Sequence, residues 1–188
     1  MKPVITTDDK GRKVFTLQLD QLQVYALIFI IPLILLFGLP FYLVWGENAF
    51  TALRFRSFLF LTVFILGGVA VHELLHGITW ALFAKKGFRS ISFGIKWEYL
   101  TPYCHCSEPL KVWQFVAGAL APAVIMGFLP AVSALFTGNT LLMCFGIFYF
   151  WAASADILTV WLMRRLKKNQ LVSDHPKELG FIVEEGKK

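Results

Sequence analysis

Four long apolar stretches dominate this sequence of 188 residues. They cover residues 24–45, 58–84, 112–136 and 141–163. About 20 consecutive apolar residues are enough to cross the ~30 Å hydrocarbon core of a bilayer as a helix. The mean hydropathy of +0.64 and the hydrophobic fraction of 57% also exceed what a soluble domain of this size needs. We therefore expect an all-α membrane protein with four transmembrane helices.

Three segments follow from this pattern. Residues 1–22 form a cytoplasmic N-terminal segment, in which two strand-like runs flank the turn residues 8–11 and predict a hairpin. Residues 23–168 form one integral-membrane domain, and residues 169–188 form a polar cytoplasmic tail. Between the second and third apolar stretches, residues 88–109 alternate in polarity and predict a short β-hairpin on the cytoplasmic side.

The basic residues predict the orientation in the membrane. With four spans, sixteen of the 18 Lys and Arg residues fall on the side that holds both termini, against Arg54 and Arg56 on the other. The positive-inside rule then places both termini in the cytoplasm, in a bacterial inner membrane. The net charge of +6 is therefore attributed to the segments that flank the membrane spans. It predicts the lipid bilayer as a partner and no binding of nucleic acid. The charged start of the chain also argues against a cleaved signal peptide.

The second apolar stretch contains the motif His72-Glu73-Leu74-Leu75-His76. On a helix, two histidines four positions apart leave the same face, so both imidazoles can bind one zinc ion. Glu73 lies beside such an ion and can take a proton from water. The alternative is a pair of structural histidines inside a helix bundle. Ionisable groups in an apolar stretch are costly and usually functional, which favours the zinc interpretation.

Asp156 is the other acidic residue inside an expected span. His76 lies nine residues before Lys85, and Asp156 lies eight residues before Arg164. At 1.5 Å per residue, both lie roughly 12–14 Å from the cytoplasmic ends of their helices. Asp156 can therefore meet the histidines at one level, where zinc is a sensible partner for a carboxylate in lipid. The alternative is an acid that pairs with Ser154 or a backbone donor.

The segment Cys104-His105-Cys106 carries further groups that bind metals or protons. His105 is a rival third ligand. Two added thiolates would fill the coordination sphere, whereas a hydrolytic zinc keeps a position for water. We therefore assign His105 a catalytic role, orienting a ligand or stabilising an oxyanion, with interfacial loop residues as the alternative for all three.

These residues resemble the site-2 protease class of intramembrane zinc metalloproteases. More closely, they are similar to a bacterial family of unknown function described as "putative zincin peptidases". The resemblance rests on His72 to Gly77, on Ala121-Pro122 and on Ser154-Ala155-Asp156-Ile157. It implies a zincin-like membrane domain in which Asp156 is the third zinc ligand. Site-2 proteases have glycine after this aspartate, where this chain has Ile157.

The function expected is that of a zinc metalloendopeptidase of the His-Glu-x-x-His type. It would hydrolyse peptide bonds of membrane-associated proteins or peptides, using water activated by Zn2+. The alternative is a non-catalytic membrane protein that binds zinc for structure or scaffolding. Di-iron chemistry needs about four carboxylates, and the spans offer only Glu73 and Asp156. The sequence leaves the oligomeric state open.

Overall fold

The computed structural model describes residues 4–52, 55–97, 101–176 and 178–184 of the chain. The chain forms two compact units. We call one the sheet unit, which comprises Met1–Gln23, Glu73–Ala121 and Ala155–Lys188. We call the other the helical unit, which comprises Val24–His72 and Pro122–Ser154. Part of the charge count above, including Arg54, falls outside the described residues.

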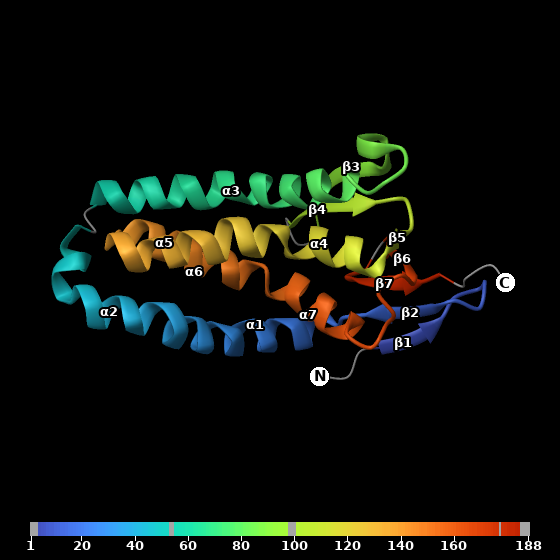
Figure 1. The fold of residues 1–188 in the computed structure, drawn as a ribbon, viewed down its shortest axis with the longest axis horizontal. Coiled ribbons are helices and arrows are strands. Elements are labelled where there is room, and N and C mark those ends of the chain that lie inside the picture. The colour runs from blue at the N-terminus through green and yellow to red at the C-terminus, as the bar shows by residue number, and fades with distance from the viewer. Residues whose placement is uncertain (1–3, 53–54, 98–100, 177, 185–188) are drawn as a thin grey trace. The chain divides into compact units, whose positions relative to one another are not determined.

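A five-stranded antiparallel sheet gives the sheet unit its name (Figure 1). Its strands, in spatial order, are β1 (Val4–Thr7), β2 (Lys13–Thr16), β7 (Gly180–Val183), β6 (Leu171–Asp174) and β5 (Leu110–Lys111). The expected N-terminal hairpin is present as β1 and β2, with Val4 opposite Thr16. β2 also pairs with β7, so residues near the two ends of the chain lie in one sheet.

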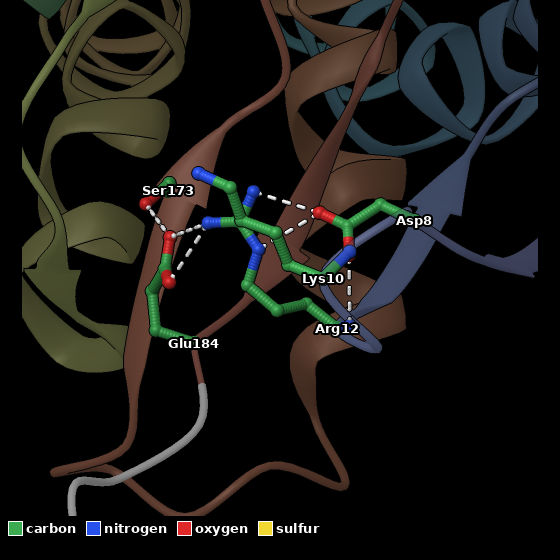
Figure 2. A network of polar contacts seen from close by, with 5 residues as sticks. All are labelled: Asp8, Lys10, Arg12, Ser173 and Glu184. Carbon is green, nitrogen blue, oxygen red and sulfur yellow. Dashed lines mark hydrogen bonds and ion pairs between the residues drawn. The ribbon is translucent and has the colours of Figure 1, made fainter.

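Arg12 ties the N-terminal hairpin to the C-terminal strands (Figure 2). Its guanidinium donates through Nη1 to both carboxylate oxygens of Glu184, at 2.9 and 3.0 Å. It also donates through Nε to Asp8 at 2.8 Å, within the β1–β2 turn. Ser173 on β6 donates to the same Glu184 carboxylate. This planar, bidentate contact holds the β1–β2 turn against the residue that follows β7.

The expected hairpin after the second apolar stretch is present as β3 (Ile91–Lys96) and β4 (Thr101–Cys106). It packs on the C-terminal turns of helix α3 (Phe55–Ala81). A Cβ atom added at Gly77 would lie 2.5 Å from Phe93 Cζ and 3.0 Å from Ile91 Cγ2. Glycine is therefore required at this position of α3 to let the hairpin approach the helix.

The core of the sheet unit lies between the sheet and three helices, α3, α4 (Val112–Pro122) and α7 (Ser154–Met163). Large apolar side chains fill it. The buried members are Trp80, Cys106, Leu110, Val112, Phe115, Ala119, Met163, Val172, Phe181 and Val183. Burial of this kind stabilises a fold in proportion to the apolar area removed from water.

The helical unit contains α2 (Leu39–Trp45), α5 (Leu129–Thr137), α6 (Thr140–Ala152) and most of both α1 (Leu19–Leu33) and α3. Two π-helical segments, Ile34–Gly38 and Ala123–Phe128, interrupt the first and third apolar stretches. Each ends just before a proline in the first turn of the next helix, Pro40 or Pro130. Because proline cannot donate to the carbonyl four residues earlier, the helix widens at these points instead of ending.

The expected fold class, all-α with four transmembrane helices, is wrong. The structure is 63% helix and 18% strand, and the strands form two antiparallel sheets. Three helical segments are long and apolar enough to cross a membrane, namely Gln21–Trp45, Phe58–Ala81 and Val112–Thr137. The fourth apolar stretch is a pair of helices, α6 and α7, bent by 45° after Ala152, and counts as a span only if the pair is taken together. The pairings of β2 with β7 and of β5 with β6 escaped sequence reasoning because these strands are distant along the chain.

Candidate metal centre

Helix α3 carries His72, Glu73 and His76 on consecutive turns of one continuous helix. Both histidines are buried, with 8% and 3% of their surface exposed. Their spacing of four residues places both rings on the same face. The apolar stretch that predicted a membrane helix therefore also delivers two imidazoles to one buried position.

Asp156 approaches His76 from helix α7, in the sheet unit. The break after Ala152 puts Asp156 in the first turn of α7, where the positive end of the helix dipole favours a carboxylate. His76 Nε2 lies 3.6 Å from Asp156 Oδ1, which is too long for a good hydrogen bond. His72, His76 and Asp156 each offer one ligand atom, and these atoms lie within 4.8 Å of one another.

This donor set fits a zinc ion. Two ligands at about 2.1 Å from a tetrahedral ion stand about 3.4 Å apart, close to the His76–Asp156 separation. Two imidazole nitrogens and one carboxylate oxygen also match the ligand types of catalytic zinc sites. Among the residues that the structure describes, these three make up the cluster.

The hydrogen bond made by Nδ1 of His76 determines the tautomer of this ring. Nδ1 lies 2.9 Å from the backbone carbonyl oxygen of Gly118 on α4. A carbonyl can only accept, so Nδ1 carries the proton and donates it. In the neutral ring this leaves the lone pair on Nε2, the atom nearest to Asp156. His76 is thus held in the form that binds a metal through Nε2.

Tyr149 of α6 packs beside His72 within the helical unit. The two ring centroids are 6.2 Å apart, and Tyr149 is fully buried. Its hydroxyl donates to the carbonyl of Ile65, two turns before His72 on α3. A methyl group at Gly68 would overlap the Tyr149 hydroxyl, so glycine is needed there for α6 to approach α3.

Glu73 lies on the side of α3 that the β3–β4 hairpin covers. It is one turn before Gly77, which contacts Phe93, and Phe93 is paired with Cys104 on β4. Burial and, after it, the charges of Glu73 and of Asp174 raise the pKa of the Cys104 thiol. Cys104 was expected only as a metal-binding or interfacial residue. Neighbouring side chains of a strand point to opposite faces, so the sequence could have predicted that Cys104 and His105 face opposite sides of β4.

His105 points to the other face of β4. Its Nδ1 lies 2.8 Å from Asp174 Oδ2 on β6, and this hydrogen bond raises the pKa of His105. The structure therefore brings His72, His76 and Asp156 together and places His105 with Asp174 instead. The catalytic role of His105 stays a prediction that this placement does not support. Asp174 on β6 is the partner that sequence reasoning missed.

A His-Glu-x-x-His helix with a third, acidic donor on a second helix is a pattern that zinc peptidases use to bind their metal. Residues 65–171 match the model of the family described as "Putative zincin peptidase". This match covers more than half of the chain, and the chain belongs to that family. Membership indicates a metallopeptidase with zinc as its usual cofactor. Among curated proteins and solved structures, none matches the chain.

Proposed function

We propose that this protein is an intramembrane zinc metalloprotease that hydrolyses peptide bonds of membrane-associated proteins. The observation that carries the proposal is the convergence of His72, His76 and Asp156 on one buried point of an apolar helix. Membership of the peptidase family supports the hydrolytic chemistry, and the three candidate spans support the membrane setting.

Each residue has a separate role in this proposal. His72, His76 and Asp156 would hold a zinc ion, which supplies the Lewis acidity that makes water nucleophilic near neutral pH. Glu73 accepts the proton of the attacking water and later donates it to the leaving amine. Gly118 keeps the Nδ1 proton on His76, so that this ring serves as a neutral ligand.

The number of protein donors favours catalysis over a structural zinc. Structural zinc sites are closed by four protein ligands, whereas catalytic sites keep one position for water or substrate. The cluster among the described residues has three members and does not include Cys104 or His105. A scaffolding role would call for one of these two in direct contact with the metal.

The charge distribution supports cytoplasmic termini and hence a site near the cytoplasmic side. Lys85 and Lys86 follow α3 shortly after His76, and a basic cluster of Arg and Lys follows α7 after Asp156. The substrate would be a membrane protein or peptide whose scissile bond reaches this depth.

The test compares Glu73→Gln with Glu47→Gln, an exposed acid far along the chain from the motif. Purified proteins are analysed for zinc, and cleavage of a tagged single-span membrane reporter is followed. We expect Glu73→Gln to retain zinc and to lose cleavage by a factor of about 10² or more, while Glu47→Gln behaves as wild type. Retained cleavage in Glu73→Gln rules the mechanism out.

Metal analysis of two further variants tests the ligand set. His76→Ala and Asp156→Ala should each lose the zinc, because two remaining ligands hold it poorly. If Asp156→Ala retains zinc while His105→Ala or Cys104→Ala loses it, a non-catalytic, closed site replaces the peptidase proposal.

A further inference from the structure

We propose that Pro122, Gly118 and Trp80 are positioning residues that set the tautomer and the ring plane of His76. The inference rests on the proposed function, because it concerns how His76 is prepared to bind zinc. Two independent groups of contacts carry it, one to the Nδ1 atom of the ring and one to its face.

The first contact is the hydrogen bond from His76 Nδ1 to the Gly118 carbonyl, at 2.9 Å. Gly118 is inside helix α4, where a carbonyl normally accepts from the N–H four residues later. The residue four positions after Gly118 is Pro122, which has no N–H, and a proline ring also crowds that carbonyl. Pro122 therefore leaves the Gly118 carbonyl without its helical donor, and His76 supplies a donor in its place.

The second contact is the stack of Trp80 on His76. Trp80 is one turn after His76 on α3, with ring centroids 5.3 Å apart and ring planes 17° apart. Trp80 is itself fixed, because its Nε1 donates to the Phe115 carbonyl at 3.1 Å and its ring packs on Phe115 at 5.1 Å. Both partners of His76, the ring of Trp80 and the carbonyl of Gly118, are buried.

Gly118 joins the two contacts. A Cβ atom at this position would overlap the Trp80 ring, so only glycine lets the Trp80 indole lie against α4. One residue thus supplies the carbonyl for Nδ1 and the space for the ring that covers His76. Partners of this kind around a zinc-bound histidine commonly matter for affinity, since they fix the ligand's proton and orientation.

The decisive variant is Pro122→Ala, with Pro130→Ala as its matched control in the same apolar stretch. Alanine restores the N–H that bonds to the Gly118 carbonyl, and it suits a helix better than proline does. We expect zinc affinity, measured by competition with a chelator, to fall about 10- to 100-fold while thermal stability is unchanged or higher. A residue with a merely structural role would lower both together. Pro130→Ala should leave zinc affinity unchanged.

A readout without metal separates this inference from the proposed function. In ¹⁵N-histidine-labelled apoprotein in detergent micelles, at a pH high enough for the His76 ring to be neutral, wild-type His76 should show the Nδ1–H tautomer, and Pro122→Ala should show a mixture. His76→Asn assigns the signals. If wild type binds no zinc but shows this tautomer change, the peptidase proposal fails and the positioning role stands. If Pro122→Ala keeps both the tautomer and the wild-type affinity, or if Pro130→Ala loses as much, the positioning role is overturned.

Trp80 is tested by graded substitution. Trp80→Phe keeps an aromatic ring for His76 but loses the bond to the Phe115 carbonyl, whereas Trp80→Leu loses both. Zinc affinity should fall less in Trp80→Phe than in Trp80→Leu. In the Trp80→Leu background, Gly118→Ala should lower zinc affinity little further, because the added methyl group no longer overlaps an indole ring. Equal affinities for wild type and Trp80→Leu would contradict this part of the role.

Discussion

In the sheet unit, large side chains such as Phe181 and Val172 are completely buried, and Phe181 stacks on Phe15 with centroids 5.0 Å apart. In the helical unit, large side chains such as Tyr149 and Phe41 are buried as well, but α5 and α6 meet through small residues. A Cβ at Gly146 of α6 would lie 2.5 Å from the backbone nitrogen of Ala131 on α5, and Ala131 is itself fully buried. The backbones of α5 and α6 therefore approach closely at this point.

The exposed surfaces of the two units also differ. Long apolar side chains of the π-helical segment Ile34–Gly38 and of α2 and α3 are exposed in the helical unit, among them Leu36, Leu43 and Phe64 at 60–72%. Hydrogen bonds there run from aromatic side chains to backbone carbonyls, as from Trp45 to Leu135 at 3.0 Å and from Trp151 to Ala26 at 2.8 Å. In the sheet unit they include charged pairs such as Arg12 with Glu184.

The difference indicates two sources of stability in one chain. The sheet unit is stabilised by removing apolar area from water. Where lipid surrounds a helix, burying an apolar side chain gains little free energy. Close backbone contact and hydrogen bonds between helices then provide most of the stabilisation. The motif helix α3 contributes to both, because the division between the units falls within it, between His72 and Glu73.

The largest effect is expected for Phe181→Ala. Removing a fully buried phenylalanine should lower the free energy of unfolding by about 3–5 kcal/mol. Phe64→Ala on the exposed face of α3 removes the same atoms and should change it by less than about 0.5 kcal/mol. Unfolding in detergent micelles measures both. Equal losses of unfolding free energy in the two variants would contradict the difference between the units, since they would mean that Phe64 is buried in the protein.

Gly146→Ala tests the close helix contact of the helical unit. The added methyl meets the backbone of Ala131, which cannot rotate away, so we expect a loss of about 1–3 kcal/mol. Gly67→Ala on α3 is the control, because nothing lies within 4 Å of its Cβ position. Alanine is the better helix former there, by up to about 1 kcal/mol, so this variant should be neutral or stabilised. A neutral Gly146→Ala would show that α5 and α6 can separate freely.

The sequence alone could predict most of the metal centre. The spacing of His72 and His76 and the matching depth of Asp156 needed only helix geometry, and the structure brings these groups within 4.8 Å. The carbonyl partner of His76 was also within reach of the sequence, since Pro122 is four residues after Gly118 and cannot donate to it. This spacing shows that the Gly118 carbonyl lacks its usual helical donor. Which residue donates to it instead depends on how α3 packs on α4.

The five-stranded sheet could not be predicted in the same way. β5 is two residues long, and β2 pairs with β7 across almost the whole chain, so local alternation says nothing of either pairing. The bend between α6 and α7 was also missed, although Ser154 and Asp156 are residue types that favour the first turn of a helix. His105 was assigned by its neighbours in sequence, whereas its partner Asp174 comes from a distant strand.

The smallest expected effect is a pH dependence confined to the sheet unit. The hydrogen bond from His105 to Asp174 raises the pKa of His105 above its unfolded value of about 6.5. A raised folded pKa gives stabilisation that is complete below the unfolded pKa and is lost as pH rises through the folded pKa. Because both groups are partly exposed, we expect no more than about 1 kcal/mol.

Asp174→Asn isolates this charge, because the amide oxygen can still accept from Nδ1–H of His105. Melting temperatures should differ from wild type near pH 6, and the difference should shrink as the pH rises and His105 loses its charge. Trp45→Phe in the helical unit removes a bond between uncharged groups, so its cost should be the same at both pH values. A pH-independent cost for Asp174→Asn would mean that the His105–Asp174 contact stabilises the sheet unit as a neutral hydrogen bond, like those between the helices.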